Sequence, residues 1–242
     1  MKIFYINLEN RCDRKGHMEE MLSKLGVDYE RFNAISPSLE QIKTGVYQKF
    51  FMKGSHFLKQ LTKKDRCQKR ARGVFGCYLS HLFIHEKMTE SRSPYLILED
   101  DVIISSNSID ELKKMTENES FKDWDIIRSI WNNKEGYLSE SGFKNINRDI
   151  KKITGVPKQS KFKTDFETHL IFGGTHFSLF RNSKKIQSFL REESVFDIDA
   201  VYSNVKLNVY CDRTPMHKTQ PKGILDVSLV DWRGSDIPKT LL

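Results

Sequence analysis

The feature that most limits how this chain can fold is its alternation of short apolar runs with helical patterns. An apolar run over Lys2–Leu8 precedes a helical pattern that closes at Gly26, and Tyr29–Ile35 can supply the next strand. The apolar positions of this first helix are Met18, Met21, Leu22 and Leu25. Such alternation is typical of an α/β sandwich. We therefore predict an α/β fold with a central, mostly parallel sheet flanked by helices.

The same alternation continues further along the chain. Further predicted helices are Val74–Met88, Ser108–Thr116 and Ser183–Arg191, and further predicted strands are Tyr95–Leu98, Trp124–Trp131 and Leu170–Phe180. Ser36–Arg72 is less regular, and Asn145–Lys163 has the composition of a loop. A chain of 242 residues without an internal repeat is within the size range of one α/β domain. We predict a single domain over residues 1–242.

The net charge indicates which classes of partner the protein could bind, and the cysteines indicate its cellular compartment. The formal net charge of +8 favours acidic partners, which include nucleotides, phosphorylated glycans, nucleic acid and anionic membrane surfaces. The four cysteines form no Cys-x-x-Cys pair, so reduced thiols are the simplest interpretation. The apolar run at the start is shorter than expected for a signal peptide, and no stretch approaches the ~20 apolar residues that span a bilayer. We expect a cytoplasmic protein, and its basic runs would also suit the anionic inner face of the inner membrane.

Three consecutive carboxylates directly follow the apolar run Tyr95–Leu98: Glu99, Asp100 and Asp101. Ligands of α/β sheets bind at the edge where strands end. Adjacent carboxylates repel one another there unless a cation or a basic partner neutralises them, and hard oxygen ligands suit Mg²⁺ or Mn²⁺. The alternative is that the triplet caps the next segment or faces solvent.

Four segments in a characteristic order resemble glycosyltransferase family 25, which contains bacterial lipooligosaccharide glycosyltransferases and relatives that glycosylate collagen. The segments are Tyr5–Arg14 (YINLENRCDR), Gly73–His81 (GVFGCYLSH), Leu98–Asp101 (LEDD) and Phe196–Asp199 (FDID), so the resemblance spans residues 2–202. It implies a GT-A-like fold, a nucleotide-sugar donor that is often UDP-galactose, a divalent cation (Mn²⁺ or Mg²⁺), and inversion to a β-linkage. The implied acceptor is a lipooligosaccharide or lipopolysaccharide glycan.

Within this resemblance, Glu99 and Asp101 are the predicted metal ligands. The predicted donor-binding residues are Asn7, Leu8, Arg11, Arg14, Ser80, His81 and Asp100. The loop after the first strand of an α/β fold commonly receives a nucleotide, and arginines there can bind a diphosphate. The alternative for Arg11 and Arg14 is a solvated helix start, with Asp13 pairing locally. The alternative for His81 is a hydrogen-bonded core histidine.

An inverting transfer needs one base to take the proton of the acceptor hydroxyl, and a carboxylate can serve. Asp199 is the first candidate and Asp197 the second; capping or surface charge is the alternative for both. His217 could add a metal or diphosphate contact, although a surface histidine is the more ordinary interpretation. Gly173–His176 loosely resembles the family's glycine-containing strand and receives no predicted role.

Two other classes of function remain open from the residues alone. Lys59–Arg72 and Lys151–Lys163 could bind nucleic acid or a membrane surface without catalysis, but few aromatic residues are interleaved there and no nucleic acid partner is expected. A metal-dependent phosphoryl-transfer enzyme or glycan hydrolase also uses acidic clusters. The chain has no Gly-x-x-x-x-Gly-Lys-Ser/Thr loop, and adjacent carboxylates on one strand are not an opposed hydrolase pair.

Overall fold

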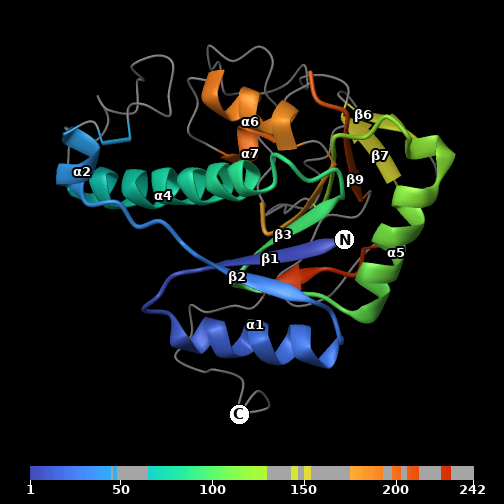
Figure 1. Cartoon of the computed structure of the whole chain (residues 1–242), viewed down its shortest axis with the longest axis horizontal. Coiled ribbons are helices and arrows are strands. Elements are labelled where there is room, and N and C mark those ends of the chain that lie inside the picture. The colour runs from blue at the N-terminus through green and yellow to red at the C-terminus, as the bar shows by residue number, and fades with distance from the viewer. Residues whose placement is uncertain are drawn as a thin grey trace.

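The fold is built on one large sheet with helices on both faces, as a computed structural model of the chain shows (Figure 1). The structure describes residues 1–44, 46–47, 65–129, 143–146, 150–153, 175–181, 183–192, 198–202, 206–212 and 225–229. In this part of the chain the sheet has eight strands in the order β2-β1-β3-β8-β5-β9-β7-β6. The α/β class predicted from the sequence is confirmed.

The strands of the large sheet are short and mostly buried. Their bounds are β1 Lys2–Asn7, β2 Tyr29–Asn33, β3 Tyr95–Glu99, β5 Ile126–Arg128, β6 Phe143–Asn145, β7 Ile150–Ile153, β8 Phe177–Phe180 and β9 Val209–Asp212. A separate two-stranded sheet pairs β4 (Val102–Ile103) with β10 (Ser228–Leu229).

The large sheet is mixed, which corrects the prediction of a mostly parallel one. β1 runs parallel to both β2 and β3, and β5 runs parallel to β9. β8 is antiparallel to its neighbours β3 and β5, and the edge strands β7 and β6 are also joined by antiparallel pairing. Strand direction depends on how distant segments pair, so the local alternation of strands and helices could not reveal it.

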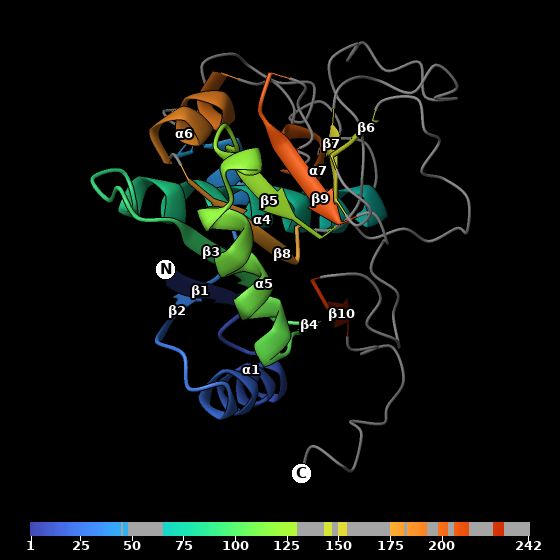
Figure 2. The same cartoon turned by 90° about the vertical axis from the view of Figure 1, so that its right-hand side faces the viewer.

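Each face of the sheet is covered by its own set of helices. α1 (Cys12–Lys24) and α5 (Ser106–Glu117) cover one face, whereas α4 (Asp65–Lys87) and α6 (Ser183–Glu192) cover the other (Figures 1 and 2). Short helices α2 (Leu39–Lys43) and α7 (Ile198–Val201) and a 3₁₀ turn, η2 (Glu119–Phe121), complete the described elements. In β1, Phe4 packs toward α4 while Ile3 and Tyr5 pack toward α1, because successive strand side chains point to opposite faces.

Three sequence-based boundaries differ from the structure. α4 begins at Asp65, within the basic segment predicted to be irregular, because charged residues hid the helical pattern. β6 and β7 replace part of the loop predicted over Asn145–Lys163; the lysines of β7 masked it as a strand. α5 begins earlier than predicted because Ser105 is the N-cap and forms a capping box with Ser108.

Gly76 allows α4 to lie directly against the chain that leaves β2. A Cβ atom at this position would lie 2.2 Å from the carbonyl oxygen of Ile35, so only glycine fits without movement of the backbone. One turn later, the Ser80 hydroxyl accepts the Ile35 N–H at 2.8 Å and donates to the Gly76 carbonyl at 2.7 Å. The Gly-Cys-x-x-Ser-His segment therefore fixes α4 to the exit of β2.

Gly76→Ala is expected to destabilise the protein by about 1–3 kcal/mol, because the added methyl group must push α4 away from Ile35. Gly73→Ala is the matched control, since a Cβ there meets nothing within 4 Å on the same helix. That control should be neutral or stabilising by up to about 1 kcal/mol, because alanine favours the helix. Urea denaturation of both variants measures the difference, and equal stabilities would contradict the role given to Gly76.

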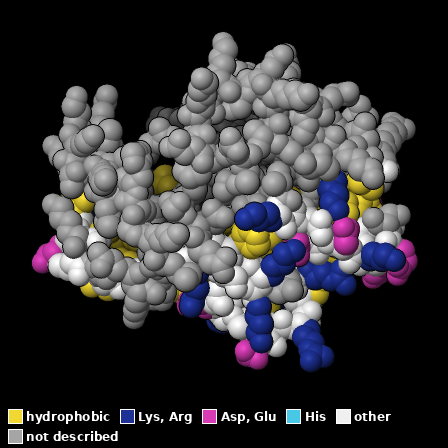
Figure 3. Space-filling view, turned by 90° about the horizontal axis from the view of Figure 1, so that it is seen from above, with side chains coloured by type: hydrophobic (Ala, Val, Ile, Leu, Met, Phe, Trp, Pro, Cys, Tyr) yellow, Lys and Arg dark blue, Asp and Glu magenta, His cyan; other side chains and the backbone are white. Residues whose placement is uncertain are grey.

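The charge distribution on the surface and the character of the helices bear on the alternative of a nucleic-acid- or membrane-binding protein. Lysine and arginine side chains are interspersed with aspartate and glutamate on the described surface in Figure 3. Most of Lys59–Arg72 and Lys151–Lys163 lies outside the residues whose side chains the structure describes. Among the described helices, none combines the length and the apolar character needed to cross a bilayer. Among the described residues, Cys12, Cys77 and Cys211 are not part of a disulfide.

Candidate functional site

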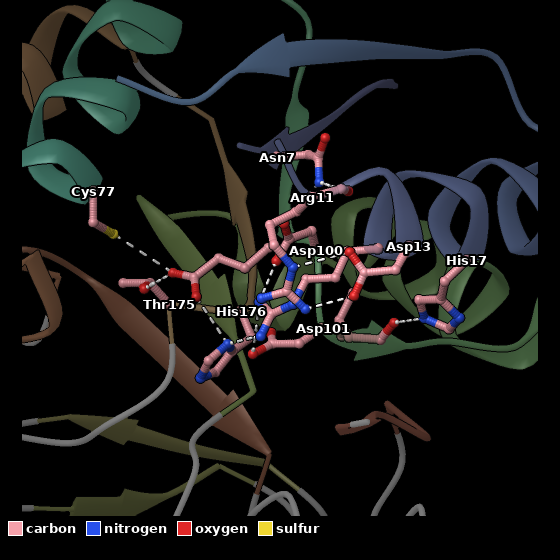
Figure 4. A network of polar contacts seen from close by, with 12 residues as sticks. Asn7, Arg11, Asp13, His17, Cys77, Asp100, Asp101, Thr175 and His176 are labelled. Atoms are coloured by element: carbon pink, nitrogen blue, oxygen red, sulfur yellow. Dashed lines mark hydrogen bonds and ion pairs between the residues drawn. The ribbon is translucent and has the colours of Figure 1, made fainter. Parts of the chain in front are cut away.

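The C-terminal ends of β1, β2 and β3 meet at one edge of the sheet, and the acidic triplet lies there (Figure 4). Parallel register places Ile6 beside Glu99 and Asn7 beside Asn33. Because β8 is antiparallel to β3, its N-terminal end reaches the same edge, and the Glu99 N–H donates to the carbonyl of His176 at 3.0 Å. The C-terminal ends of β1, β2 and β3 and the N-terminal end of β8 thus form one polar site, which we call the polar corner.

Asp100 connects the ends of β1 and β3. Its Oδ2 accepts from Asn7 Nδ2 at 2.9 Å, and its Oδ1 accepts from the Arg14 guanidinium at 2.6 Å. Burial raises the pKa of Asp100, and the contacts with Arg14 and Asn7 only partly offset this. Both oxygens already have partners within the protein. Asp100 therefore holds Arg14 in place at the corner, where the sequence analysis predicted a donor contact.

Glu99, Asp101 and His176 form a compact set of potential metal ligands. His176 Nδ1 lies 2.9 Å from Glu99 Oε2 and 2.9 Å from Asp101 Oδ1, and the three ligand atoms lie within 4.8 Å of one another. Two carboxylate oxygens and one imidazole nitrogen suit Mn²⁺, Fe²⁺ or Zn²⁺, and the carboxylates suit Mg²⁺. The predicted ligands Glu99 and Asp101 are thus brought together, and the donor set fits a divalent cation.

The protonation of this set shows how strongly its charges interact. Burial alone would raise the pKa of Glu99, but His176 and His81 outweigh burial and hold that pKa well below its usual value. Burial alone would lower the pKa of His176, but Glu99 and Asp101 outweigh it and raise that pKa well above its usual value. An imidazolium or a divalent cation can therefore neutralise the two carboxylates at this place.

His176 is the principal site residue that the sequence analysis missed. The signal was its place in Gly173–His176, a segment that loosely resembles a family strand, but nothing local predicted that it would face Glu99. That position follows from antiparallel pairing of β8 with β3. Gly173 and Gly174 lie outside the described residues.

The loop after β1 and the first turn of α1 place two predicted donor residues, Leu8 and Arg14, at the corner and leave a third, Arg11, in a local pair. Arg14 contacts Asp100 and lies 3.9 Å from Asp101, and Leu8 is 39% exposed beside it. Arg11 instead donates two hydrogen bonds to Asp13, with nitrogen–oxygen distances of 2.9 and 2.6 Å. Arg11 thus forms the local pair with Asp13 that the sequence analysis gave as the alternative to donor binding.

The middle of α4 forms the other wall of the corner. Cys77 Sγ lies 3.7 Å from Glu99 Oε1, and His81 Nε2 lies 3.8 Å from the same oxygen. The Thr175 hydroxyl also donates to this oxygen. His81 is fully buried, so it faces Glu99 from inside the protein, and the hydroxyl of Ser80 is engaged by the backbone contacts described above.

A pocket with a volume of about 370 Å³ opens at this corner. It has an apolar side and a charged side, and the residues that line it are Ile6, Leu8, Arg14, Ala34, Ile35, Ser36, Arg72, Gly73, Cys77, Ser80, Glu99 and Asp100. Arg14 and Arg72 bring two guanidinium groups to the rim beside two carboxylates. Clefts of this size with a few convergent polar groups are typical small-ligand sites.

Asp199 lies near the same edge of the sheet, on the short helix α7. Its Oδ1 lies 3.4 Å from a guanidinium nitrogen of Arg128, which is fully buried at the end of β5. The side chain of Asp199 is 27% exposed, so solvent or a ligand can reach it. Asp197 and His217, the other candidates in this half of the chain, lie outside the described residues.

Comparisons with known proteins place these motifs in a family. Residues 1–171 match the profile described as "Glycosyltransferase family 25 (LPS biosynthesis protein)". A "Glycosyltransferase 25 family member" of Anopheles gambiae is 33% identical over 101 residues, which cover 41% of this chain and 16% of the relative. The "Lipooligosaccharide biosynthesis protein lic2B" of Haemophilus influenzae is 28% identical over 106 residues, covering 43% and 35%.

A viral relative gives a match of similar extent. The "Putative glycosyltransferase R655" of Acanthamoeba polyphaga mimivirus is 30% identical over 118 residues, which cover 48% of this chain and 33% of the relative. The aligned segments therefore span about a third or less of these relatives. The first three of the four sequence segments lie within the matched residues 1–171, in agreement with the resemblance, whereas Phe196–Asp199 lies beyond them.

Proposed function

Because the chain belongs to glycosyltransferase family 25, we propose that it transfers a sugar from a nucleoside-diphosphate donor to a glycan acceptor. The specific proposal is an inverting transfer from a UDP-sugar, with galactose as the expected sugar, within a GT-A-like domain. A lipooligosaccharide or lipopolysaccharide glycan is the proposed acceptor, in line with the description of the family as lipopolysaccharide biosynthesis proteins and with the name of the Haemophilus relative. Such an acceptor would be met at the inner face of a membrane.

The pocket at the polar corner is the observation that carries this proposal. Its apolar side, formed by Ile6, Ala34 and Ile35, suits the flat faces of a nucleobase. Its guanidinium groups, from Arg14 and Arg72, suit the oxygens of a diphosphate, because a guanidinium can donate two parallel hydrogen bonds to such a group. A nucleotide with a diphosphate would match both sides at once.

Glu99, Asp101 and His176 would hold a divalent cation, Mn²⁺ or Mg²⁺, next to that diphosphate. A cation bound there supplies Lewis-acid stabilisation of the negative charge that develops on the leaving diphosphate. The protein's own contribution is to hold the two carboxylates in place: Thr175 donates to Glu99, and the backbone of β8 binds that of β3. Arg14, fixed by Asp100, adds a positive charge on the same side.

Asp199 is the proposed general base. The acceptor hydroxyl must lose its proton as its oxygen attacks the anomeric carbon, and a carboxylate can take this proton without a covalent intermediate. Arg128 lies beside Asp199 and favours its charged, proton-accepting form. Asp197 remains the second candidate.

The proposed function is tested by incubating the protein with Mn²⁺ and a panel of UDP-, GDP- and CMP-sugars, with and without truncated lipooligosaccharide, and measuring released nucleotide and glycosylated product. Acceptor-dependent release of UDP with a new β-linkage supports the proposal. Release of inorganic phosphate would indicate phosphoryl chemistry. Salt-sensitive binding of polyanions without any donor turnover would favour a non-catalytic basic protein.

Arg14→Ala is expected to raise the KM for the donor by roughly 10- to 100-fold, because it removes a charge-assisted contact to the diphosphate and leaves Asp100 without its cationic partner. Arg11→Ala should have a smaller effect, since Arg11 is paired with Asp13. Arg191→Ala is the control, because it removes an exposed arginine that pairs with Glu86 on the far part of α4. Equal donor KM values for the Arg14 and Arg191 variants would place the nucleotide elsewhere.

A further inference from the structure

A continuous chain of buried polar groups lies behind Glu99, and the proposed function does not use it. Tyr95 on β3, His85 and His81 on α4, and Tyr202 after α7 are each no more than 1% exposed. The Tyr95 hydroxyl lies 2.5 Å from His85 Nδ1, and the Tyr202 hydroxyl lies 2.6 Å from His85 Nε2 and 2.9 Å from His81 Nδ1. The chain ends at His81 Nε2, 3.8 Å from Glu99 Oε1.

The geometry of α4 makes this chain possible. His81 and His85 are four residues apart, so they lie on the same face of the helix, and the hydroxyl of Tyr202 can reach both rings. Phe180 packs edge-on against His85 and stacks with Tyr95, so the chain is surrounded by aromatic rings. In such an apolar environment every hydrogen-bonding group needs a partner, which restricts the direction in which the hydrogens can point.

The direction of the hydrogen bonds along these four side chains follows from counting their donors and acceptors. Burial lowers the pKa of His85 well below its usual value, so this ring is neutral and has one donor and one acceptor. Within the described residues, His85 Nδ1 is the partner of the Tyr95 hydroxyl, so that hydroxyl donates to Nδ1. His85 Nε2–H then donates to the oxygen of Tyr202.

The remaining steps fix the proton of His81. Since the Tyr202 oxygen accepts from His85, its own hydrogen is available to His81 Nδ1. An imidazole whose Nδ1 accepts a hydrogen bond carries its hydrogen on Nε2, and in His81 this is the nitrogen that faces Glu99. If every hydrogen bond were reversed, the hydroxyl hydrogen of Tyr95 would have no acceptor among the described residues. The lone pair of His81 Nε2 would then face the carboxylate of Glu99.

We propose that His85 and Tyr202 are positioning residues that keep the hydrogen of His81 on Nε2, the buried nitrogen that faces Glu99 Oε1 at 3.8 Å and has no hydrogen-bond partner among the described residues. This oxygen accepts a hydrogen bond from Thr175 and faces the thiol of Cys77. The other oxygen, Oε2, is directed at His176 and Asp101, where the cation of the proposed function would bind. The consequence for cation binding rests on that proposed function, whereas the hydrogen-bond direction does not.

The same geometry offers a competing arrangement that the proposal excludes. Cys77, His81 and Glu99 also bring ligand atoms within 4.8 Å of one another, and a thiol with an imidazole would suit Zn²⁺. His81 could ligate only through a lone pair on Nε2, which requires the reversed chain. The tautomer of His81 therefore distinguishes the two arrangements.

The direct test is a ¹⁵N NMR measurement of the His81 tautomer in protein labelled at histidine, with the resonance assigned by a His81→Gln variant. The proposal expects hydrogen on Nε2 in the native protein. Tyr95→Phe removes the donor that sets the direction, so the His81 signal should move toward a mixture of tautomers. A hydrogen on Nδ1, or on both nitrogens, in the native protein would overturn the proposal and favour the Cys77 arrangement.

The second test follows Mn²⁺ binding by the loss of the free-ion EPR signal in the presence of UDP. Tyr202→Phe should weaken binding by about 10- to 100-fold, as loss of a partner behind a metal ligand commonly does. Tyr78→Phe is the matched control: it also removes a buried hydroxyl contact of α4, to Leu190, but is not part of this chain. Equal Mn²⁺ affinities in the two variants would overturn the positioning role.

The two tests separate failure of this inference from failure of the proposed function. A native protein that binds no Mn²⁺ and turns over no sugar donor would contradict the proposed function. The NMR result would still decide the direction of the hydrogen bonds from Tyr95 to His81. If Tyr202→Phe does not fold, Tyr95→Phe, which keeps both contacts of Tyr202, provides the same comparison against Tyr78→Phe.

Discussion

Asp199→Asn is expected to lower turnover by roughly 10²- to 10⁴-fold, because asparagine cannot accept the proton of the acceptor hydroxyl. The amide keeps the size of the side chain and its place beside Arg128, so the fold should persist. Donor binding should persist as well, since the pocket lined by Arg14 and Arg72 is untouched. Steady-state kinetics at saturating acceptor measure kcat, and nucleotide titration measures donor affinity.

Asp123→Asn is the matched control for this prediction. Asp123 is also an aspartate paired with a cation, Lys152 at 2.7 Å, but it is half exposed and does not line the pocket. Its change should leave kcat close to the native value. If Asp199→Asn keeps its turnover while Asp197→Asn or a change at His81 abolishes it, the base lies at that other position.

Removal of the divalent cation is the second change with a large expected effect. Excess chelator should abolish transfer, and Mn²⁺ or Mg²⁺ should restore it. Asp101→Asn should lower kcat/KM by roughly 10²- to 10³-fold, because metal-assisted charge stabilisation contributes several kcal/mol and each 1.4 kcal/mol is about tenfold. The variant should also need more Mn²⁺ for half of its maximal rate, which a titration of the residual activity measures.

Asp110→Asn provides the comparison for Asp101→Asn. Asp110 is an exposed aspartate of α5 whose nearest cation is Lys113, three residues further along the same helix. Because such surface pairs contribute little, its change should be nearly neutral. Full activity of the native protein in chelator, or unaltered turnover of a folded Asp101→Asn protein, would contradict the metal role and indicate that the carboxylates are structural.

The elements closest to their predicted bounds are those with a strong local pattern. β1, α1 and α6 lie within a few residues of their predicted ranges, since apolar periodicity and polar ends mark them in the sequence. β3 was located with the carboxylates at its end, because four consecutive apolar residues precede them. In the large sheet, strands β6, β7 and β9 were missed: β7 is rich in lysine, and β6 and β9 are only three and four residues long.

Parts of the site that depend on distant pairing could not be predicted from local sequence. The edge of the sheet and the carboxylates of β3 followed from the pattern, but the approach of His176 to Glu99 required knowledge that β8 is antiparallel. Arg11 and Arg14 have the same charge and nearly the same place in the sequence, yet only Arg14 lines the pocket. Burial and partners, not residue type, separate the two arginines.

The pairing of β8 with β3 also determines which changes in the chain the site can tolerate. The register Leu98↔Phe177, and not the length of chain between these residues, sets His176 opposite Glu99. The entropy of closing a loop grows only with the logarithm of its length, about 0.6 kcal/mol for each doubling, so an insertion outside the paired strands would cost little and leave this register unchanged. A slip of one residue in that register, by contrast, would turn the side chains of β8 to the opposite faces of the sheet and carry the imidazole away from both carboxylates.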